Sequence, residues 1–417
     1  MLTQQENDLL TQVGPGTPGG EMMRRYWHPV ALGEELPESG APLPVRLLGE
    51  DLVLFRDDSG QPGLLGIHCA HRGADLSYGR LEDGGLRCIY HGWLYDRAGR
   101  CLEQPGEPAG STFHERIRQT AYPCIDRGGL ILTYMGPGDP PLCPDYEFLT
   151  VPKRQRSATK FYQECNYLQG NEGNFDPQHL SFLHRIYRHD EADFRQDLHA
   201  KDVAPRIEPV DTEFGMHLYA LRAVGDEETF AKVRSFVMPD LALVGSRGDE
   251  GYVVNWHVPI DDTTHWRYSL MFTRDANVDP DELRQNRSGD SVNYRLNRNR
   301  ANRYLQDREE MKTETFLGVG RNFAVHDTMA TESEGDIYDR TQEHLGYTDR
   351  GIIHLRQIMA AAVKDVQEGR DPIHVIRDQA QNEFPDMVAR DQVIRTSGGW
   401  QGFWKDRTTQ EMAASAR

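Results

Sequence analysis

The sequence predicts an α+β protein in which a small antiparallel β domain precedes a larger domain with an antiparallel sheet surrounded by helices. Short β-rich runs alternate with Gly, Asp and Pro turns from Pro44 to Thr133, which is typical of antiparallel β structure. Longer strand-like runs recur between His217 and Val258, and apolar residues repeat at helical spacing near the C-terminus. A length of 417 residues predicts two to three domains with ample material for buried cores.

An N-terminal segment is expected to precede the small β domain, with the boundary between them near residue 43. Residues 1–43 are predicted to be helical and irregular, with a short helix over residues 6–12 that ends at the breaker Gly14-Pro15-Gly16. The β domain is expected over residues 44–145, and the turn-forming run Gly136-Pro-Gly-Asp-Pro-Pro marks its end. Its clearest predicted strands are Val45–Leu48, Leu52–Phe55 and Leu130–Tyr134.

The remaining chain, residues 146–417, is predicted to form the larger domain. Residues 276–312 are polar and rich in Asn and Arg, which predicts an exposed insertion or solvated helices. A core-facing helix before Gly369 is predicted from the apolar positions Leu355, Ile358, Met359, Ala362, Val363 and Val366. The strand-like runs are His217–Ala223, Arg234–Met238, Leu241–Val244 and Tyr252–Val258.

Composition limits the class of partner. The formal charge of −18 argues against non-specific nucleic-acid binding, and a well-solvated acidic surface explains it. The N-terminus lacks the basic and apolar regions of a signal peptide, and no stretch approaches the roughly 18–20 apolar residues of a membrane span. We therefore predict a cytoplasmic protein that binds neither nucleic acid nor membranes. Four scattered cysteines are predicted to be free thiols, namely Cys101, Cys124, Cys143 and Cys165.

Two Cys/His pairs lie close together in the predicted β domain: Cys69-Ala-His71 and, after sixteen residues, Cys88-Ile-Tyr-His91. Two thiolates and two imidazoles form the Rieske ligand set, which holds a [2Fe–2S] cluster with one iron on sulfur and the other on nitrogen. Structural zinc uses the same residue types, but zinc fingers usually group Cys with Cys and His with His. Each loop here carries one of each, and Gly73 and Gly92 let backbone N–H groups approach sulfur, so the cluster is favoured.

A second candidate site follows at Asp176-Pro177-Gln-His179-Leu-Ser-Phe-Leu-His184. Pro177 suits the first turn of a helix with Asp176 as its N-cap. Two histidines five residues apart point in different directions on a regular helix, so convergence on one metal requires a distortion such as a π-type bulge. Two imidazoles and one distant carboxylate would form the facial triad of non-haem Fe(II) oxygenases.

Together, the two stretches resemble the oxygenase components of the Rieske non-haem iron oxygenases. The motif of that family matches Glu172, Asp176, His179 and His184 in spacing. Respiratory Rieske proteins carry an extra disulfide-forming Cys on each loop, where this chain has Ala74 and Tyr90. The runs Leu9–Pro18, Met23–Pro29 and Asp339–Gly346 are similar to the phthalate dioxygenase and aromatic O-demethylase branch.

The resemblance implies a third iron ligand, an Asp some 130–150 residues beyond the second His and followed five residues later by Glu. Asp327, with Glu332, fits this pattern and lies 143 residues after His184. Asp339 and Asp336 are the alternatives, although Asp339 also has an ordinary structural interpretation as a charged residue at a helix start.

The resemblance further implies a terminal oxygenase that uses O₂ and electrons from an NAD(P)H reductase, with or without a ferredoxin. The substrate would be aromatic, with an aromatic carboxylate favoured, and the reaction dihydroxylation, monooxygenation or O-demethylation. A homotrimer, alone or stacked into a hexamer, is implied, with Asp176 bridging the cluster of one subunit and the iron of the next. Arginines able to bind a substrate carboxylate are Arg206, Arg222, Arg234 and Arg247.

Two functions from other classes remain open at this point. A Rieske-type electron carrier with a degenerate second domain would contain about two irons per chain instead of about three. A zinc-stabilised binding protein would be colourless.

Overall fold

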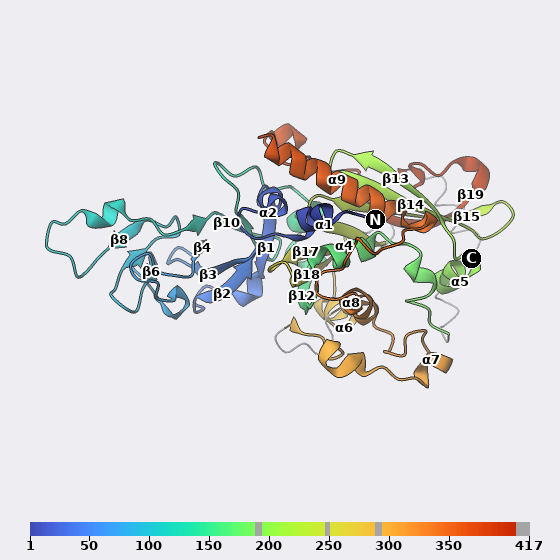
Figure 1. The fold of residues 1–417 in the computed structure, drawn as a ribbon, viewed down its shortest axis with the longest axis horizontal. Helices are drawn as coiled ribbons and strands as arrows, with labels where there is room; N and C mark the ends of the chain where they lie inside the picture. The colour runs from blue at the N-terminus through green and yellow to red at the C-terminus, as the bar shows by residue number, and fades with distance from the viewer. Residues whose placement is uncertain (188–193, 247–250, 288–293, 406–417) are drawn as a thin grey trace.

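The protein is an elongated molecule with a small β lobe at one end and a larger mixed lobe at the other (Figure 1). This computed structural model describes residues 1–187, 194–246, 251–287 and 294–405. The mixed architecture confirms the predicted α+β class. No helix in these ranges is long and apolar enough to cross a membrane.

The β lobe contains two four-stranded antiparallel sheets, with orders β2-β3-β4-β9 and β5-β6-β7-β8. A buried apolar cluster that includes Phe55, Leu65 and Tyr95 joins them. The strands are β2 (Leu43–Leu47), β3 (Glu50–Arg56), β4 (Pro62–Gly66), β5 (Arg80–Glu82), β6 (Gly85–Arg87), β7 (Leu94–Tyr95), β8 (Cys101–Glu103) and β9 (Ala121–Tyr122). The two Cys/His pairs lie on the loops that follow β4 and β6.

A three-stranded sheet of order β1-β11-β10 lies between the lobes (Figure 1). It consists of β1 (Trp27–Leu32), β10 (Cys124–Arg127) and β11 (Leu130–Tyr134). Every residue of β1 is buried, so the N-terminal segment contributes a strand that the sequence analysis did not expect. The predicted N-terminal helix is present as α1 (Gln4–Thr11), whose N-terminus is closed by a capping box between Thr3 and Glu6.

The large lobe is built on an eight-stranded antiparallel sheet of order β12-β18-β17-β16-β15-β14-β13, with β19 also paired to β15. Strand β15 pairs with β19 along its first part and with β16 at its end. All four predicted runs overlap strands of this sheet. Its strands are β12 (Arg156–Gln163), β13 (Arg206–Thr212), β14 (Gly215–Ala223), β15 (Glu228–Val237), β16 (Leu241–Ser246), β17 (Tyr252–Pro259), β18 (His265–Phe272) and β19 (Ala389–Arg395).

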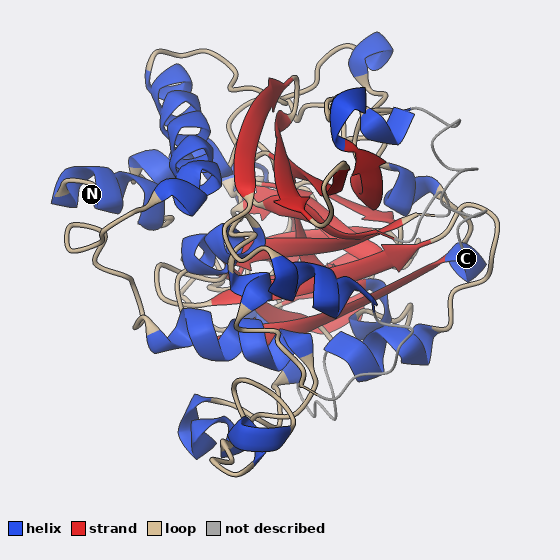
Figure 2. Cartoon of the chain, turned by 90° about the vertical axis from the view of Figure 1, so that its right-hand side faces the viewer, coloured by secondary structure: helices blue, strands red, loops and turns tan. Residues whose placement is uncertain are grey.

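Helices cover this sheet on both sides (Figure 2). The predicted core-facing helix is α9 (Arg350–Gln367), which buries Leu355, Met359 and Val363 and packs against β13 and β14. Helix α4 (Tyr167–Asn174) packs on β16, β17 and β18, and α8 (Phe323–Ser333) packs beside α4. The other helices are α2 (Pro18–Met23), α3 (Glu147–Thr150), α5 (Phe194–Lys201), α6 (Pro280–Arg287) and α7 (Glu310–Thr313).

The polar stretch 276–312 forms α6, α7 and a 3₁₀ turn in its described part. It is not simply solvated, because Val278 and Leu283 are buried and α6 packs against β12 and β18.

Candidate metal centres

The two Cys/His loops of the β lobe have the same construction. In each loop the glycine N–H donates to the cysteine carbonyl, Gly73 to Cys69 at 2.8 Å and Gly92 to Cys88 at 3.0 Å. Both glycines adopt a φ near +74° (73° and 74°), which closes the turn and disfavours other residues. The backbone conformation therefore favours glycine at both positions.

The four candidate ligand side chains on these loops differ in their exposure to solvent. Cys69 and Cys88 are both buried, whereas His71 is half-buried and His91 is exposed. The imidazole ring centroids of His71 and His91 lie 4.6 Å apart. Burial and the nearby Cys69 thiol raise the pKa of the Cys88 thiol, so a bound cation would be needed to hold the Cys88 sulfur as a thiolate. The two cysteine sulfurs lie on the buried side of the loops and the two imidazoles toward the surface, and these four ligands fit a Rieske cluster.

Three neighbouring side chains fix these loops. The indole of Trp93 stacks on His71 with ring centroids 4.3 Å apart and planes 9° from parallel. The hydroxyl of Tyr95 lies 3.2 Å from the Cys69 sulfur. Gln119 accepts from the Ala70 N–H and donates to the carbonyls of Gly66, at the end of β4, and His68. Sequence reasoning missed Gln119, since nothing in its local pattern marks it.

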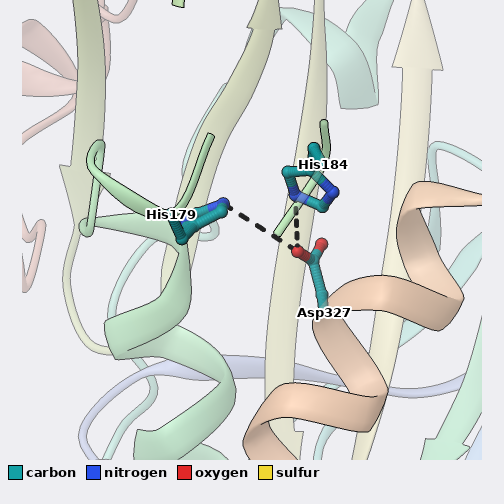
Figure 3. Close-up of side chains that lie close together, drawn as sticks. All are labelled: His179, His184 and Asp327. Atoms are coloured by element: carbon teal, nitrogen blue, oxygen red, sulfur yellow. Dashed lines mark ion pairs between the residues drawn. The ribbon is translucent and has the colours of Figure 1, made fainter. Parts of the chain in front are cut away.

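The second centre lies in the large lobe, where His179 and His184 converge on Asp327 (Figure 3). The Nε2 atom of His184 lies 2.9 Å from Asp327 Oδ1, and that of His179 lies 4.0 Å from the same oxygen. Each of the three residues offers one potential ligand atom, and these three atoms all lie within 4.8 Å of one another. Two imidazoles and a carboxylate in this arrangement fit the facial triad of non-haem iron.

The backbone that brings the two histidines together differs from our prediction. Residues His179–Ser181 form a single 3₁₀ turn, and Phe182 then leaves helical geometry. As predicted, the turn is distorted, but the distortion is a short 3₁₀ turn and not a π-type bulge in a longer helix. The Asp176 carboxylate accepts from the Gln178 N–H as an N-terminal cap would, but the short turn lets the chain redirect before His184.

The third candidate comes from α8. Asp327 occupies the second turn of that helix. Asp336 instead pairs with Arg300 at 2.7 Å, and Asp339 is exposed and accepts from Thr341. Of the three aspartates, only Asp327 faces both histidines.

Arg267 of β18 holds the outer oxygen of Asp327. Its Nη1 and Nη2 atoms lie 3.2 and 3.3 Å from Oδ2, leaving Oδ1 directed at the histidines. Although burial opposes ionisation, His184 and Arg267 hold the pKa of Asp327 well below its usual range. The carboxylate is therefore ionised at neutral pH, as a metal ligand must be. Arg267 was missed because it lies 60 residues from its partner.

Asp176 and Glu172 occupy different surroundings near this centre. Asp176 Oδ2 lies 3.6 Å from His179 Nδ1, and the side chain keeps partial exposure. Glu172 is buried against Arg340 at 2.8 Å and Arg356 at 2.6 Å. Despite burial, these two guanidinium groups lower the pKa of Glu172, so this residue ties α4 to α9.

A cavity of about 310 Å³ opens beside the triad and is lined by all three of its residues. Its wall also carries Lys232 and Arg234 from β15 and Arg390 from β19. Arg234 donates from Nη1 to the Asn174 carbonyl at 3.0 Å. A second cavity of about 330 Å³ adjoins His179 and Asp327 and is lined by Asp176.

The other arginines considered as carboxylate binders lie elsewhere. Arg206 is exposed and pairs with Glu208 at 2.8 Å. Arg222 is fully buried and donates to the Pro177 and Asp202 carbonyls. Arg247 lies outside the described residues.

Known proteins share both halves of this architecture. The family model for the Rieske [2Fe-2S] domain matches residues 26–121, and the model described as "LigXa C-terminal domain like" matches residues 133–416. The phthalate 4,5-dioxygenase oxygenase subunit of Pseudomonas putida is 37% identical, over 89% of each chain. The chain belongs to the Rieske non-haem iron oxygenases. It is the oxygenase component of such a system, and the electron-carrier and zinc-protein alternatives are not favoured.

Further relatives of this Rieske oxygenase differ in the reactions that their names state. The 5,5'-dehydrodivanillate O-demethylase oxygenase subunit of Sphingobium sp. is 34% identical, over 92% of this chain and 85% of its own. The fold is shared with the oxygenase in the reduced oxygenase–ferredoxin complex of carbazole 1,9a-dioxygenase, with a TM-score of 0.58 and 21% identity. That alignment covers 91% of this chain and 97% of the other. Dicamba monooxygenase bound to dicamba has a TM-score of 0.59 at 18% identity, over 84% and 99% of the two chains.

Proposed function

We propose that this Rieske oxygenase hydroxylates an aromatic carboxylate, with electrons supplied from NAD(P)H by a reductase, directly or through a ferredoxin. The single observation that carries the substrate class is the guanidinium of Arg234 in the wall of the cavity beside the triad. Arginine suits bidentate recognition of a carboxylate, and the cavity size suits a small aromatic ring. Lys232 and Arg390 add positive charge to the same wall, and Asp391 adds one carboxylate.

We assign the metal ligands as Cys69, His71, Cys88 and His91 for the cluster, and His179, His184 and Asp327 for the mononuclear iron. When bound, the cluster would supply electrons one at a time and the mononuclear iron would supply O₂ activation. Wild-type protein should contain about three irons per chain. The variants His179→Ala and Asp327→Ala should each contain about two irons per chain and should retain the Rieske EPR signal. Loss of that signal in either variant, or full iron retention, would contradict the assignment.

For Asp176 we propose a bridging role in electron transfer. The carboxylate reaches His179 on one side and has exposed surface for a second imidazole on the other. Both metals should remain bound in Asp176→Asn, and cluster reoxidation in a single turnover should slow by orders of magnitude. Reoxidation at the wild-type rate would exclude the bridge.

The carboxylate assignment is tested with Arg234→Gln. Loss of a charge-assisted hydrogen bond should weaken binding of benzoates and phthalates about 10–100-fold, whereas their neutral amide analogues should bind as before. Arg206→Gln is the matched control, because Arg206 is exposed and outside the cavity. Substrate-dependent O₂ uptake measures the effect, and equal weakening for acids and amides would refute the ionic contact.

The type of oxygenation is a separate question, because the relatives named above include a dioxygenase and an O-demethylase. The position of the ring relative to the triad decides the product, since positioning dominates selectivity. Labelled O₂ distinguishes the outcomes: both labelled atoms enter one product in dihydroxylation, whereas O-demethylation of methoxy acids releases formaldehyde.

We also propose that the enzyme works in the cytoplasm as a homotrimer, alone or stacked as a hexamer. None of the six cysteines forms a disulfide, as suits a reducing compartment. Exposed aliphatic and aromatic side chains on the Cys88–His91 loop, Ile89 and Tyr90, offer a contact surface.

A further inference from the structure

A buried imidazole lies directly behind one of the proposed iron ligands. His326 of α8 is 0% exposed and precedes Asp327 in the chain. Its Nδ1 atom lies 3.2 Å from Nδ1 of His184, and the two rings stack with centroids 5.4 Å apart. Its Nε2 atom lies 2.7 Å from the carbonyl oxygen of Gly320.

These contacts determine where the protons of both rings lie. The Gly320 carbonyl can only accept, so His326 must carry its proton on Nε2. A His184 that binds a metal through Nε2 keeps its single N–H on Nδ1, the atom that lies 3.2 Å from His326 Nδ1. The Nδ1 atom of His326 is therefore an acceptor, and Nδ1–H of His184 must be the donor in the contact between them.

The consequence is a free lone pair on His184 Nε2. That atom lies 2.9 Å from Asp327 Oδ1, so a cation bound at this position would contact both atoms. The opposite tautomer would direct an N–H at Asp327 and form a hydrogen bond that competes with metal binding.

We propose that His326 is a positioning residue for the mononuclear iron, because it holds His184 in the tautomer whose Nε2 can bind the metal. This inference rests on the proposed iron site at His179, His184 and Asp327. Outer partners of metal-bound histidines commonly fix tautomer and ring orientation, and their loss typically costs 10–100-fold in metal affinity or activity.

Two nearly isosteric variants separate the hydrogen bond from packing. His326→Leu and His326→Asn have similar volumes and both lose the contact with Gly320, but only Asn keeps an oxygen that can accept from His184 Nδ1–H. Iron(II) affinity is measured by chelator competition on protein with an intact cluster, whose EPR signal reports folding. We expect affinity to fall about 10–100-fold in His326→Leu and to stay within about threefold of wild type in His326→Asn.

His217→Leu is the control for losing a buried imidazole. His217 is buried in β14 and its Nε2 lies 2.8 Å from the Asp386 carbonyl, outside both cavities beside the triad. Iron affinity should be unchanged in this variant. If His326→Leu does not fold, His326→Phe replaces it, since Phe keeps the ring and removes the acceptor.

The outcomes distinguish this inference from the proposed function. If wild type binds no third iron, or His184→Ala keeps it, the iron site itself is wrong. Suppose that wild type binds the third iron and His184→Ala loses it. If His326→Leu then binds iron(II) as tightly as wild type, the iron site stands and only the proposed role of His326 is overturned. Equal losses in the Leu and Asn variants also overturn it, because packing alone would then explain the effect.

Discussion

At the scale of single residues, the hydroxyl of Tyr95 is placed to tune the cluster. Tyr95 is fully buried, and its oxygen lies 3.2 Å from the Cys69 sulfur. A hydrogen bond to a ligating sulfur stabilises the more negative, reduced state. Tyr95→Phe should therefore lower the cluster's reduction potential by roughly 30–60 mV, which is about 0.7–1.4 kcal/mol for a one-electron couple.

EPR-monitored redox titration measures this shift. Tyr90→Phe is the matched control, because Tyr90 lies between the candidate ligands Cys88 and His91 but is 57% exposed. Its potential should stay at the wild-type value, and an unchanged potential in Tyr95→Phe would show that the hydroxyl does not reach the sulfur.

Individual residues also show what sequence can and cannot reveal about a site. The Cys/His pairs are short motifs, so their spacing alone predicts the ligand set. Arg267 and His326 contact Asp327 and His184 across long stretches of chain, and a lone His or Arg carries no signal of such a contact. Arg234 could be named as a candidate but not separated from Arg222, because only the fold shows which guanidinium faces the cavity.

At the scale of elements, β17 was predicted and its neighbour β18 was missed, and the polarity of their buried residues explains the difference. Strand β17 is entirely buried and largely apolar, so its pattern is clear. Strand β18 buries His265, Arg267 and Ser269, which interrupt the apolar run that marks a core strand. The 3₁₀ turn at His179 was also unpredictable, since tertiary contacts decide where such a short turn ends.

Two glycines of α4 make a testable pair. A Cβ on Gly170 would overlap the ring of His257 and approach His265 Nε2 to 2.8 Å, because the helix lies directly on β17 and β18. A Cβ on Gly173 meets only Thr331 Cγ2 at 3.5 Å, which is ordinary contact. Gly170→Ala should destabilise the protein by about 2–3 kcal/mol, whereas Gly173→Ala should be neutral or stabilise it by up to about 1 kcal/mol.

Urea unfolding midpoints of the two variants, compared with wild type, measure this difference. Equal stability of Gly170→Ala and Gly173→Ala would mean that the helix can move off the sheet at little cost.

At the scale of the whole molecule, the two candidate centres lie in different lobes. Strand β6, which leads to Cys88, belongs to the β lobe, and α8, which carries Asp327, belongs to the large lobe (Figure 1). The proposed ring of subunits would resolve this separation by placing the cluster of one chain beside the iron of the next. Each chain would then depend on a neighbour for its electrons.

Subunit mixing tests this dependence directly. Cys69→Ser should remove the cluster and His179→Ala the mononuclear iron, so each variant alone should be inactive. When the two are co-expressed and assemble together, a cluster in one subunit can serve the iron of its neighbour, and random assembly in a directional ring should restore roughly a quarter of wild-type turnover. Mixing the separately purified oligomers, which cannot exchange subunits quickly, is the control and should restore little. If co-assembled protein contains both subunits yet stays inactive, electrons pass within one chain, and the proposed arrangement of the ring is wrong.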